Sequence, residues 1–317
     1  MAKKAIIYIV FSIIIGSSTL AADWKYYGET GPENWDELYP TCGGDNQSPI
    51  NIVRYEAQRK TMGEFIFVGF DDMPDDAVFV LENNGHTVSL GITGEFYIFG
   101  GGLPAKYKVV ELHFHWDNLG IRGSEHAIDG MKYPLEMHLV SYNSEKYKDL
   151  TEAKMHSEGL AVLGTVIHIG GHDNEDYEPL LSGFHKVIYP GQTHTYSESF
   201  SVLRMVSHDT SNFFRYKGSL TTPTCNEAVV WTVFRDHQRI SQRQFDEFLS
   251  LKSTYEGSMI DVPLGDNYRP IQPIGKRHVY ARVAEENHGN TGCRPFNYES
   301  SIILASLAVL LNALLTV

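Results

Sequence analysis

Short apolar runs recur along the chain between polar turn residues, a pattern that is typical of β-strands. The runs are rich in β-branched and aromatic residues and are bounded by Gly, Asn and Asp. The sequence Asn83-Asn84-Gly85 predicts a tight turn between two of them. We expect strands at residues 64–68, 78–81, 87–90, 96–99, 109–116, 136–142, 160–169 and 228–234.

Helical patterns are rare by comparison. The clearest covers residues 241–251, where Ser241 can cap the helix ahead of Gln244. Its apolar face would consist of Phe245, Phe248 and Leu249. Between residues 23 and 284 the chain has no Pro/Gly/Ser-rich linker and no fixed-period repeat. We therefore expect a single, mainly β domain with a mostly antiparallel sheet and short peripheral helices.

The N-terminus has the pattern of a secretory signal peptide. Lys3 and Lys4 precede an almost unbroken apolar stretch from Ala5 to Ile15, and small residues follow at 19–22. That stretch is too short for an uncleaved membrane anchor, which is the alternative interpretation. We expect residues 1–22 to be removed as the chain enters the secretory route.

The C-terminal region has the pattern of a glycolipid (GPI) anchor signal. Residues 302–317 form an apolar segment that is short for a spanning helix and contains no Lys or Arg. The segment before it, 285–301, is a polar spacer that includes the small-residue triplet Asn290-Thr291-Gly292. We expect the tail to be removed and Asn290 to be attached to the outer leaflet of the plasma membrane. A short transmembrane helix is the alternative.

The composition narrows the function classes. The 317-residue chain is 42% hydrophobic, which is enough for a substantial core, and its net charge of −13 argues against a nucleic-acid partner. Three cysteines in a secreted chain predict one disulfide and one leftover thiol. Cys42 and Cys225 lie within the domain, whereas Cys293 would leave with the tail if the anchor is attached at Asn290.

Three histidines on two predicted strands form a candidate metal site. His113 and His115 are separated by one residue, so their side chains point to the same face of a strand. His138, on another strand, is the candidate third ligand, and Glu136 can accept the proton on its other ring nitrogen. Three neutral nitrogen ligands suit Zn²⁺ and leave a fourth position open for catalysis. The alternative interpretation is that these are ordinary strand histidines that bind no metal. A protease-type zinc site is not indicated, because the sequence contains no His-Glu-x-x-His motif.

Several motifs, in order along the chain, resemble those of the alpha carbonic anhydrases over about residues 24–284. They correspond to the family's N-terminal signature, proton-shuttle segment, metal and gatekeeper segments, pocket strand and substrate loop. The matching segments are Cys42–Ile52, Asn83–His86, Leu112–Trp116, Ser124–His126, Glu136–Val140, Gly159–Gly164 and Gly218–Pro223.

The resemblance implies a single domain around a twisted, mainly antiparallel sheet of roughly ten strands, with one zinc ion at the bottom of a conical cleft. It implies reversible hydration of CO₂ to bicarbonate and a proton at the extracellular face, by attack of a zinc-bound hydroxide. A weak esterase side activity would accompany this reaction. CO₂ and bicarbonate are the implied partners, and nothing in the sequence supports a bicarbonate transporter as a further partner.

The resemblance also implies roles for individual residues in the reaction. His113, His115 and His138 would bind zinc. Thr221 would accept a hydrogen bond from the hydroxide and donate its own proton to Glu125, since an ionised carboxylate can only accept.

Further residues would serve proton transfer and substrate binding. His86 would carry protons to solvent, because an imidazole with an ordinary pKa of about 6.5 exchanges them readily at neutral pH. Tyr27 and Asn84 would order the connecting waters.

The resemblance pairs Cys42 with Cys225, which would tie the N-terminal segment to the substrate loop. The apolar CO₂ pocket would be lined by Val140, Val162, Leu220, Thr222 and Trp231.

The chain departs from the common pattern of the family at two positions. Glu111 stands where many relatives have Gln; it shares a face with His113, so we expect it to hold that ligand and to raise the pKa of the zinc-bound water. Ser89 stands where relatives often have Asn or Gln.

Two other functions fit parts of the pattern. Catalytically silent binding modules of the family typically lack a zinc histidine, and a dedicated zinc esterase would need an acyl pocket that the sequence does not indicate.

Overall fold

The computed structural model describes residues 24–70 and 73–283. The predicted signal peptide, the anchor site at Asn290 and the apolar tail lie outside these residues. Within the described part of the chain, no helix is both long enough and apolar enough to cross a membrane.

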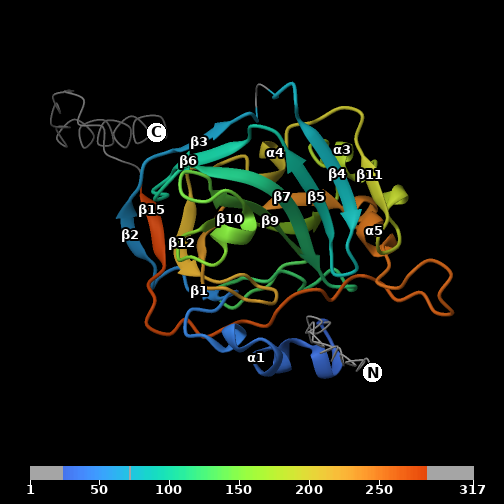
Figure 1. The fold of residues 1–317 in the computed structure, drawn as a ribbon, viewed down its shortest axis with the longest axis horizontal. Helices are drawn as coiled ribbons and strands as arrows, with labels where there is room; N and C mark the ends of the chain where they lie inside the picture. The colour runs from blue at the N-terminus through green and yellow to red at the C-terminus, as the bar shows by residue number, and fades with distance from the viewer. Residues whose placement is uncertain (1–23, 71–72, 284–317) are drawn as a thin grey trace, which may run out of the picture. The chain divides into compact units, whose positions relative to one another are not determined.

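A central sheet of 13 strands organises the domain, and ten of them follow one another across it (Figure 1). Most neighbours are antiparallel; β10 runs parallel to its neighbour β13, and β15 to β2. The order is β11 (Thr193–Thr195), β4 (Val78–Asn83), β5 (Val88–Thr93), β7 (Tyr107–Trp116), β9 (Leu135–Asn143), β10 (Leu160–Gly170), β13 (Val229–Phe234), β12 (Phe213–Gly218), β15 (Tyr280–Val283) and β2 (Gln58–Thr61). The expected mainly antiparallel sheet of roughly ten strands is confirmed.

Five shorter strands complete the β structure of the described residues. Three belong to the central sheet: β3 (Phe65–Val68) pairs with β6 (Tyr97–Gly100), and β14 (Gln238–Ser241) pairs with β10. β1 (Asn51–Ile52) and β8 (Ala127–Ile128) form a separate parallel pair.

All eight predicted strands are present, and the strands that the pattern missed are short or polar. All four side chains of β2 are exposed, and β12 contains the charged residues Arg215 and Lys217. Such segments lack the apolar runs on which the prediction rested. They are strands because they hydrogen-bond to neighbouring strands in the folded chain.

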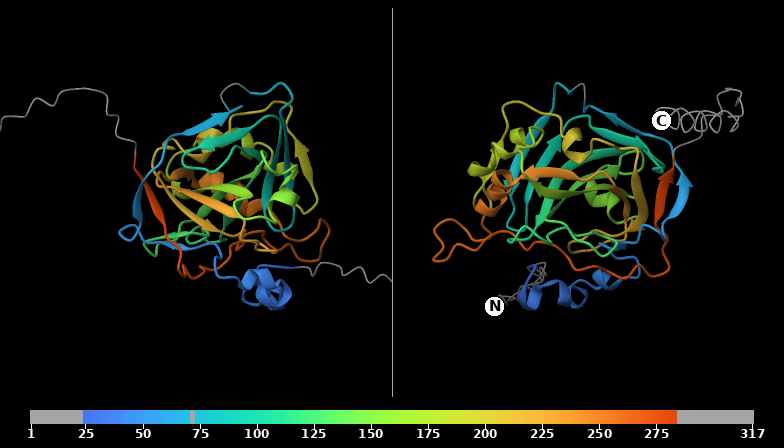
Figure 2. Two further views of the ribbon diagram at one scale, coloured as in Figure 1. Left: turned by 60° about the vertical axis from the view of Figure 1, so that its left-hand side comes forward. Right: turned by 180° about the vertical axis from the view of Figure 1, so that it is seen from behind.

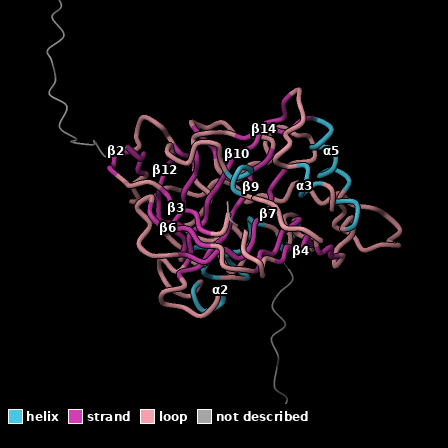
Figure 3. The backbone as a smooth tube through the Cα atoms, turned by 90° about the horizontal axis from the view of Figure 1, so that it is seen from above, coloured by secondary structure: helices cyan, strands magenta, loops and turns pink. Residues whose placement is uncertain are grey.

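The helices are short and lie around the sheet, as expected. α5 (Gln242–Ser250) begins with a reciprocal capping box between Ser241 and Gln244 and buries Phe245 and Phe248. Four others span one turn: α1 (Trp35–Leu38), α2 (Leu150–Ala153), α3 (Glu178–Leu181) and α4 (Leu203–Val206). Single turns of 3₁₀ helix are η1 (Gly28–Thr30), η2 (Pro32–Asn34), η3 (Pro40–Gly43) and η4 (Phe184–Lys186). α1 lies below the strands in both views of Figure 2, and α3 and α5 lie at one edge in Figure 3.

Alternation along β7 separates a large apolar core from the face that carries the histidines. Leu112 and Phe114 are buried in the larger of the apolar clusters, which is rich in aromatic rings. His113 and His115 alternate with them and therefore point to the opposite face of the sheet. Packing on one face thus fixes the orientation of the polar residues on the other.

One disulfide joins the N-terminal segment to the loop that follows β12. Cys42, in η3, is bonded to Cys225, 183 positions later, which confirms the expected pairing. Both cysteines are buried beside the fully buried ring of Trp35. The bridge lies four residues beyond Thr221 and restrains the loop that carries it.

We expect the double variant Cys42→Ala/Cys225→Ala to lose roughly 2–5 kcal/mol of unfolding free energy, because the bridge restricts the unfolded chain over a long loop. Urea unfolding would measure the loss. A reductant should bring the wild type to the stability of the variant and leave the variant unchanged. Non-reducing peptide maps with both cysteines as free thiols would contradict the pairing.

Candidate metal centre

The register of β7 and β9 brings the three predicted ligands together. His113 lies directly opposite His138, and His115 lies opposite Glu136. One ring nitrogen from each histidine lies within 4.8 Å of the others. His115 and His138 are each only 1% exposed, so water does not compete freely for their nitrogens.

Hydrogen bonds fix the orientation of His113 and His115. The Nδ1 atom of His113 lies 3.2 Å from Oε1 of Glu111, as the shared face of the strand predicted. The Nδ1 atom of His115 lies 2.7 Å from the carbonyl oxygen of Asn267. An acceptor at Nδ1 places the ring proton there and leaves Nε2 with a lone pair for a metal ion.

His138 is oriented in the opposite sense. Its Nε2 atom lies 2.8 Å from Oε1 of Glu136, which leaves Nδ1 for the metal. That Nδ1 atom lies 3.2 Å from Nε2 of His115. Three unprotonated nitrogens therefore converge, and this donor set fits the three-ligand catalytic site that Zn²⁺ prefers.

Burial keeps the ligands neutral. It lowers the pKa of His138 to about 4, although Glu136 partly offsets this effect, and it holds the pKa of His115 well below the ordinary value. Neutral imidazole is the form that binds metal ions, so these two ligands need not lose a proton at neutral pH.

Glu136 is itself held by a buried network. It accepts hydrogen bonds from the backbone N–H of His126 at 2.7 Å and lies 2.6 Å from the Nδ1 atom of that residue. Nε2 of His126 lies 2.6 Å from the hydroxyl of Tyr216. Burial alone would raise the pKa of Glu136, but His126 and His138 hold it well below its usual range. An ionised Glu136 can then fix the tautomer of His138.

Glu125 and Thr221 meet beside the ligands. The Glu125 side chain is fully buried; Oε1 accepts a hydrogen bond of 2.8 Å from the backbone N–H of Arg269, and Oε2 lies 3.4 Å from Nε2 of His115. Burial raises the pKa of Glu125 to about 8, although the Arg269 N–H and the Thr221 hydroxyl act to lower it. Oε2 has no well-aligned hydrogen-bond partner among the described residues.

An apolar wall adjoins the ligands. Val162 pairs with Val140 on one side and with Trp231 on the other, and all three belong to one apolar cluster. The Trp231 ring centre lies 4.8 Å from that of His138. Leu220 packs against this cluster, and Val229, which the sequence pattern did not single out as a pocket residue, is one of its buried members.

A cavity of about 120 Å³ opens over the ligands. Thr222, Ser89 and Glu111 line it together with His113 and His115. The rest of its lining consists of Trp24, Tyr26, Asn84, His86 and Thr87. The structure thus brings most of the predicted site residues to one place.

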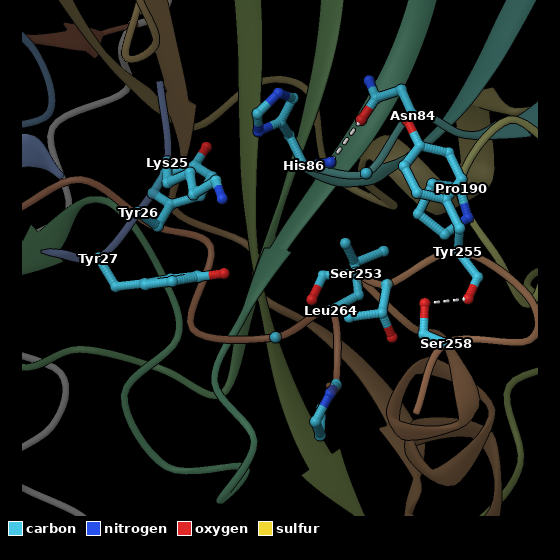
Figure 4. A pocket seen from close by; sticks show the side chains of 14 residues that line it. Lys25, Tyr26, Tyr27, Asn84, His86, Pro190, Ser253, Tyr255, Ser258 and Leu264 are labelled. Atoms are coloured by element: carbon cyan, nitrogen blue, oxygen red, sulfur yellow. Dashed lines mark hydrogen bonds between the residues drawn. The ribbon is translucent and has the colours of Figure 1, made fainter. Parts of the chain in front are cut away.

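His86 lines both this cavity and a larger hollow of about 350 Å³, which Figure 4 shows. Its ring stacks on Trp24, with ring centres 3.8 Å apart and an interplanar angle of 13°. Its backbone N–H donates to Oδ1 of Asn84 at 2.9 Å. The imidazole can therefore face both the ligand cavity and the outer hollow.

Tyr27, which we expect to order the waters of the proton path, does not line the ligand cavity. Tyr27 is 63% exposed and lines only the outer hollow, whereas its neighbour Tyr26 lines both spaces. Burial, and then the charge of Glu125, raises the pKa of Tyr26 well above its ordinary value. Adjacent side chains of an extended segment point in different directions, so Tyr26 and Tyr27 cannot both face the ligand cavity, and Tyr26 is the one that does.

Comparison with known proteins agrees with this geometry. The model of the eukaryotic-type carbonic anhydrase family matches residues 30–283. The chain is 38% identical to carbonic anhydrase 15 of Mus musculus over 259 residues, which is 79% of each chain. It is 38% identical to carbonic anhydrase 4 of Mus musculus over 278 residues, 84% of this chain and 86% of the relative. It is 36% identical to carbonic anhydrase 12 of Homo sapiens over 271 residues, 83% and 73% of the two chains.

The family match covers most of the chain, including every element that carries the three converging histidines. The zinc-type donor set and the match support the same conclusion. The chain belongs to the eukaryotic-type, or alpha, carbonic anhydrases, which catalyse the reversible hydration of CO₂ with a single zinc ion.

Proposed function

We propose that His113, His115 and His138 hold the catalytic zinc ion of a CO₂ hydratase that works at the extracellular face of the plasma membrane. The observation that carries the assignment is the hydrogen bonding of the histidines. Each ring has one nitrogen tied to an acceptor and the other directed to a common point. Zn²⁺ bound there supplies a nucleophile at neutral pH by lowering the pKa of a coordinated water to about 7.

Thr221 and Glu125 orient the nucleophile. The backbone N–H of Arg269 and the Thr221 hydroxyl favour the ionised form of Glu125 against the effect of burial on its pKa. A zinc ion held by the neighbouring histidines would favour that form further, since Oε2 lies 3.4 Å from Nε2 of His115. An ionised Glu125 can only accept, so it accepts the hydrogen bond that the Thr221 hydroxyl donates. The Thr221 oxygen is then left as an acceptor, and it would orient the nucleophile toward CO₂ by accepting a hydrogen bond from it.

The apolar wall holds the substrate. CO₂ is apolar and needs little specific binding, only a dry surface next to the nucleophile. Val140, Val162 and Trp231 provide that surface on the same face as the ligands, and Leu220 closes it from the substrate loop. A polar residue at Val140 or Val162 would hold water where CO₂ must lie.

His86 transfers the proton released in each turnover. It borders both the ligand cavity and the outer hollow, so a short chain of waters can connect it to the nucleophile on one side and to buffer on the other. The stacked ring of Trp24 keeps the imidazole at this boundary. Tyr26 and Asn84 place polar groups along the same route.

The location of the enzyme is proposed from the ends of the sequence and from the disulfide. The buried Cys42–Cys225 bond is typical of chains that fold in an oxidising compartment. Residues 1–22 fit a signal peptide and residues 23–284 the catalytic domain, and the first compact unit of the chain ends at Ala284. The polar spacer 285–301 and the apolar segment 302–317 fit a glycolipid-anchor signal with attachment at Asn290. A short transmembrane helix is the alternative.

His138→Ala should lose both zinc and CO₂ hydration, because two remaining ligands do not hold a catalytic zinc tightly. Metal analysis and stopped-flow hydration assays would measure the two losses in parallel. His172→Ala, which alters an exposed histidine outside the site, is the matched control and should keep both. Wild-type hydration by metal-free His138→Ala would refute the assignment.

His86→Ala should lower kcat by about tenfold or more while leaving kcat/KM nearly unchanged, because proton export follows CO₂ capture. Added imidazole should restore part of the lost kcat, since a free imidazole can carry the proton instead. Steady-state kinetics in weak and strong buffers would test both expectations. If kcat and kcat/KM fell equally, His86 would have another role.

Phosphatidylinositol-specific phospholipase should release active enzyme from intact cells, and truncation before Ile302 should give a freely secreted enzyme. Activity in the medium and mass spectrometry of the mature C-terminus would measure both results. A mature chain that retains Leu314 to Val317 and resists the lipase would instead indicate a transmembrane helix.

A further inference from the structure

A second cavity, of about 650 Å³, is bordered by basic side chains. It lies among β12, β15 and β2 and the loops at 102–104 and 157–158, and none of the zinc ligands lines it. Five of the chain's 26 Lys and Arg residues line it, although the net charge of the chain is −13. These five are Lys60, Arg215, Lys217, Lys276 and Arg277.

The two carboxylates at this cavity are already engaged. Glu158 forms an ion pair of 2.7 Å with Lys217. Glu227 accepts hydrogen bonds from the backbone and side-chain nitrogens of Asn46 at 2.6 and 2.9 Å, and from Nε2 of Gln47 at 3.1 Å. The other four basic side chains form no ion pair with any carboxylate of the described residues.

Arg215 is the most deeply buried of these charges, at 6% exposure. Its Nε atom donates to the Thr232 hydroxyl at 3.1 Å, but neither terminal nitrogen has a hydrogen-bond partner in the described chain. Burial lowers the pKa of Arg215 to about 10, so the group is still charged at neutral pH. The rings of Phe65 and Phe213 lie 5.8 and 5.1 Å from Cζ and offer cation–π contact but no hydrogen bond.

A buried guanidinium without a negative partner is costly, and its unsatisfied donors add to that cost. The neighbouring basic groups do not relieve it. The three hydrogen bonds of the Arg277 guanidinium all go to backbone carbonyls, of Ile274, Lys217 and Pro273. The charge of Glu227 acts on Arg277, but the two side chains form no ion pair. Lys60 contacts the ring of Tyr280 at 4.8 Å from its centre. Five basic side chains thus border the cavity against two carboxylates, and both carboxylates are engaged by other groups.

We propose that this cavity binds a phosphate or sulfate group, either as the free ion or as the monoester of a small organic molecule. Tetrahedral oxyanions accept hydrogen bonds from guanidinium and ammonium groups, and Arg277 and the lysines at the cavity would be the direct donors. Arg215, whose terminal nitrogens are buried, would contribute its charge from the wall of the cavity. The volume lies in the range of small-molecule sites, and the partly exposed ring of Tyr280 offers apolar surface to an organic part. The site is separate from CO₂ hydration and does not depend on the proposed roles of the zinc-site residues.

Isothermal titration of the zinc-loaded enzyme with inorganic phosphate, sulfate and glucose 6-phosphate, at constant ionic strength, tests the proposal. We expect saturable binding at one site that Arg215→Gln weakens by about tenfold or more. Tighter binding of the ester than of both ions would identify a monoester as the ligand, whereas equal affinities would identify the free ion. Failure of all three probes to bind saturably would overturn the proposal.

A second variant keeps the test valid if Arg215→Gln does not fold. Lys60→Gln/Lys276→Gln removes two charges from the cavity, and neither lysine side chain forms a hydrogen bond or ion pair with another described residue. Lys106→Gln/Lys186→Gln is the matched control: Lys106 likewise lies over a tyrosine ring, that of Tyr97, and neither lysine lines the cavity. The cavity variant should bind the probes about tenfold more weakly than the control. Equal affinities of the two variants would show that any anion binding occurs elsewhere, such as at the zinc ion.

Discussion

The antiparallel register between β7 and β9 is the constraint on which the metal centre depends. It sets His113 opposite His138 and His115 opposite Glu136, so the ligands and a supporting carboxylate meet on one face. Because side chains alternate with a period of two, a slip of one residue would send His138 into the opposite, apolar core. Burial of apolar side chains on that core face opposes such a slip, so hydrophobic packing holds the polar site in place.

Buried hydrogen bonds then convert this placement into fixed ligand orientations. Glu136 is held by His126, which in turn contacts Tyr216 on β12, and Glu125 is held by the backbone of Arg269. Each carboxylate would be destabilised by its burial without these donors. The donors come from distant parts of the chain, so the site becomes rigid only when the whole sheet and its loops have assembled.

The sequence predicted the parts of the fold that produce a local pattern. All eight expected strands are present, because each contains an apolar run that must be buried. β2 and β11 escaped prediction, since their pairing with neighbours rather than their composition makes them strands. For the site, the spacing of His113 and His115 and the position of Glu136 relative to His138 were sufficient, because the alternation of a strand fixes which side chains share a face.

The tertiary structure alone decided which distant residues complete the site. Asn267 lies 152 positions from His115, and the acceptor it offers is a backbone carbonyl, which no side-chain pattern can signal. The selection of Tyr26 in place of Tyr27 depends on the path of a short segment across the cavity. The charge left unpaired on Arg215 appears only once its neighbours are known. A sequence determines which side chains are available and how they alternate, but hydrogen-bond partners and desolvation follow from the surroundings that the folded chain creates.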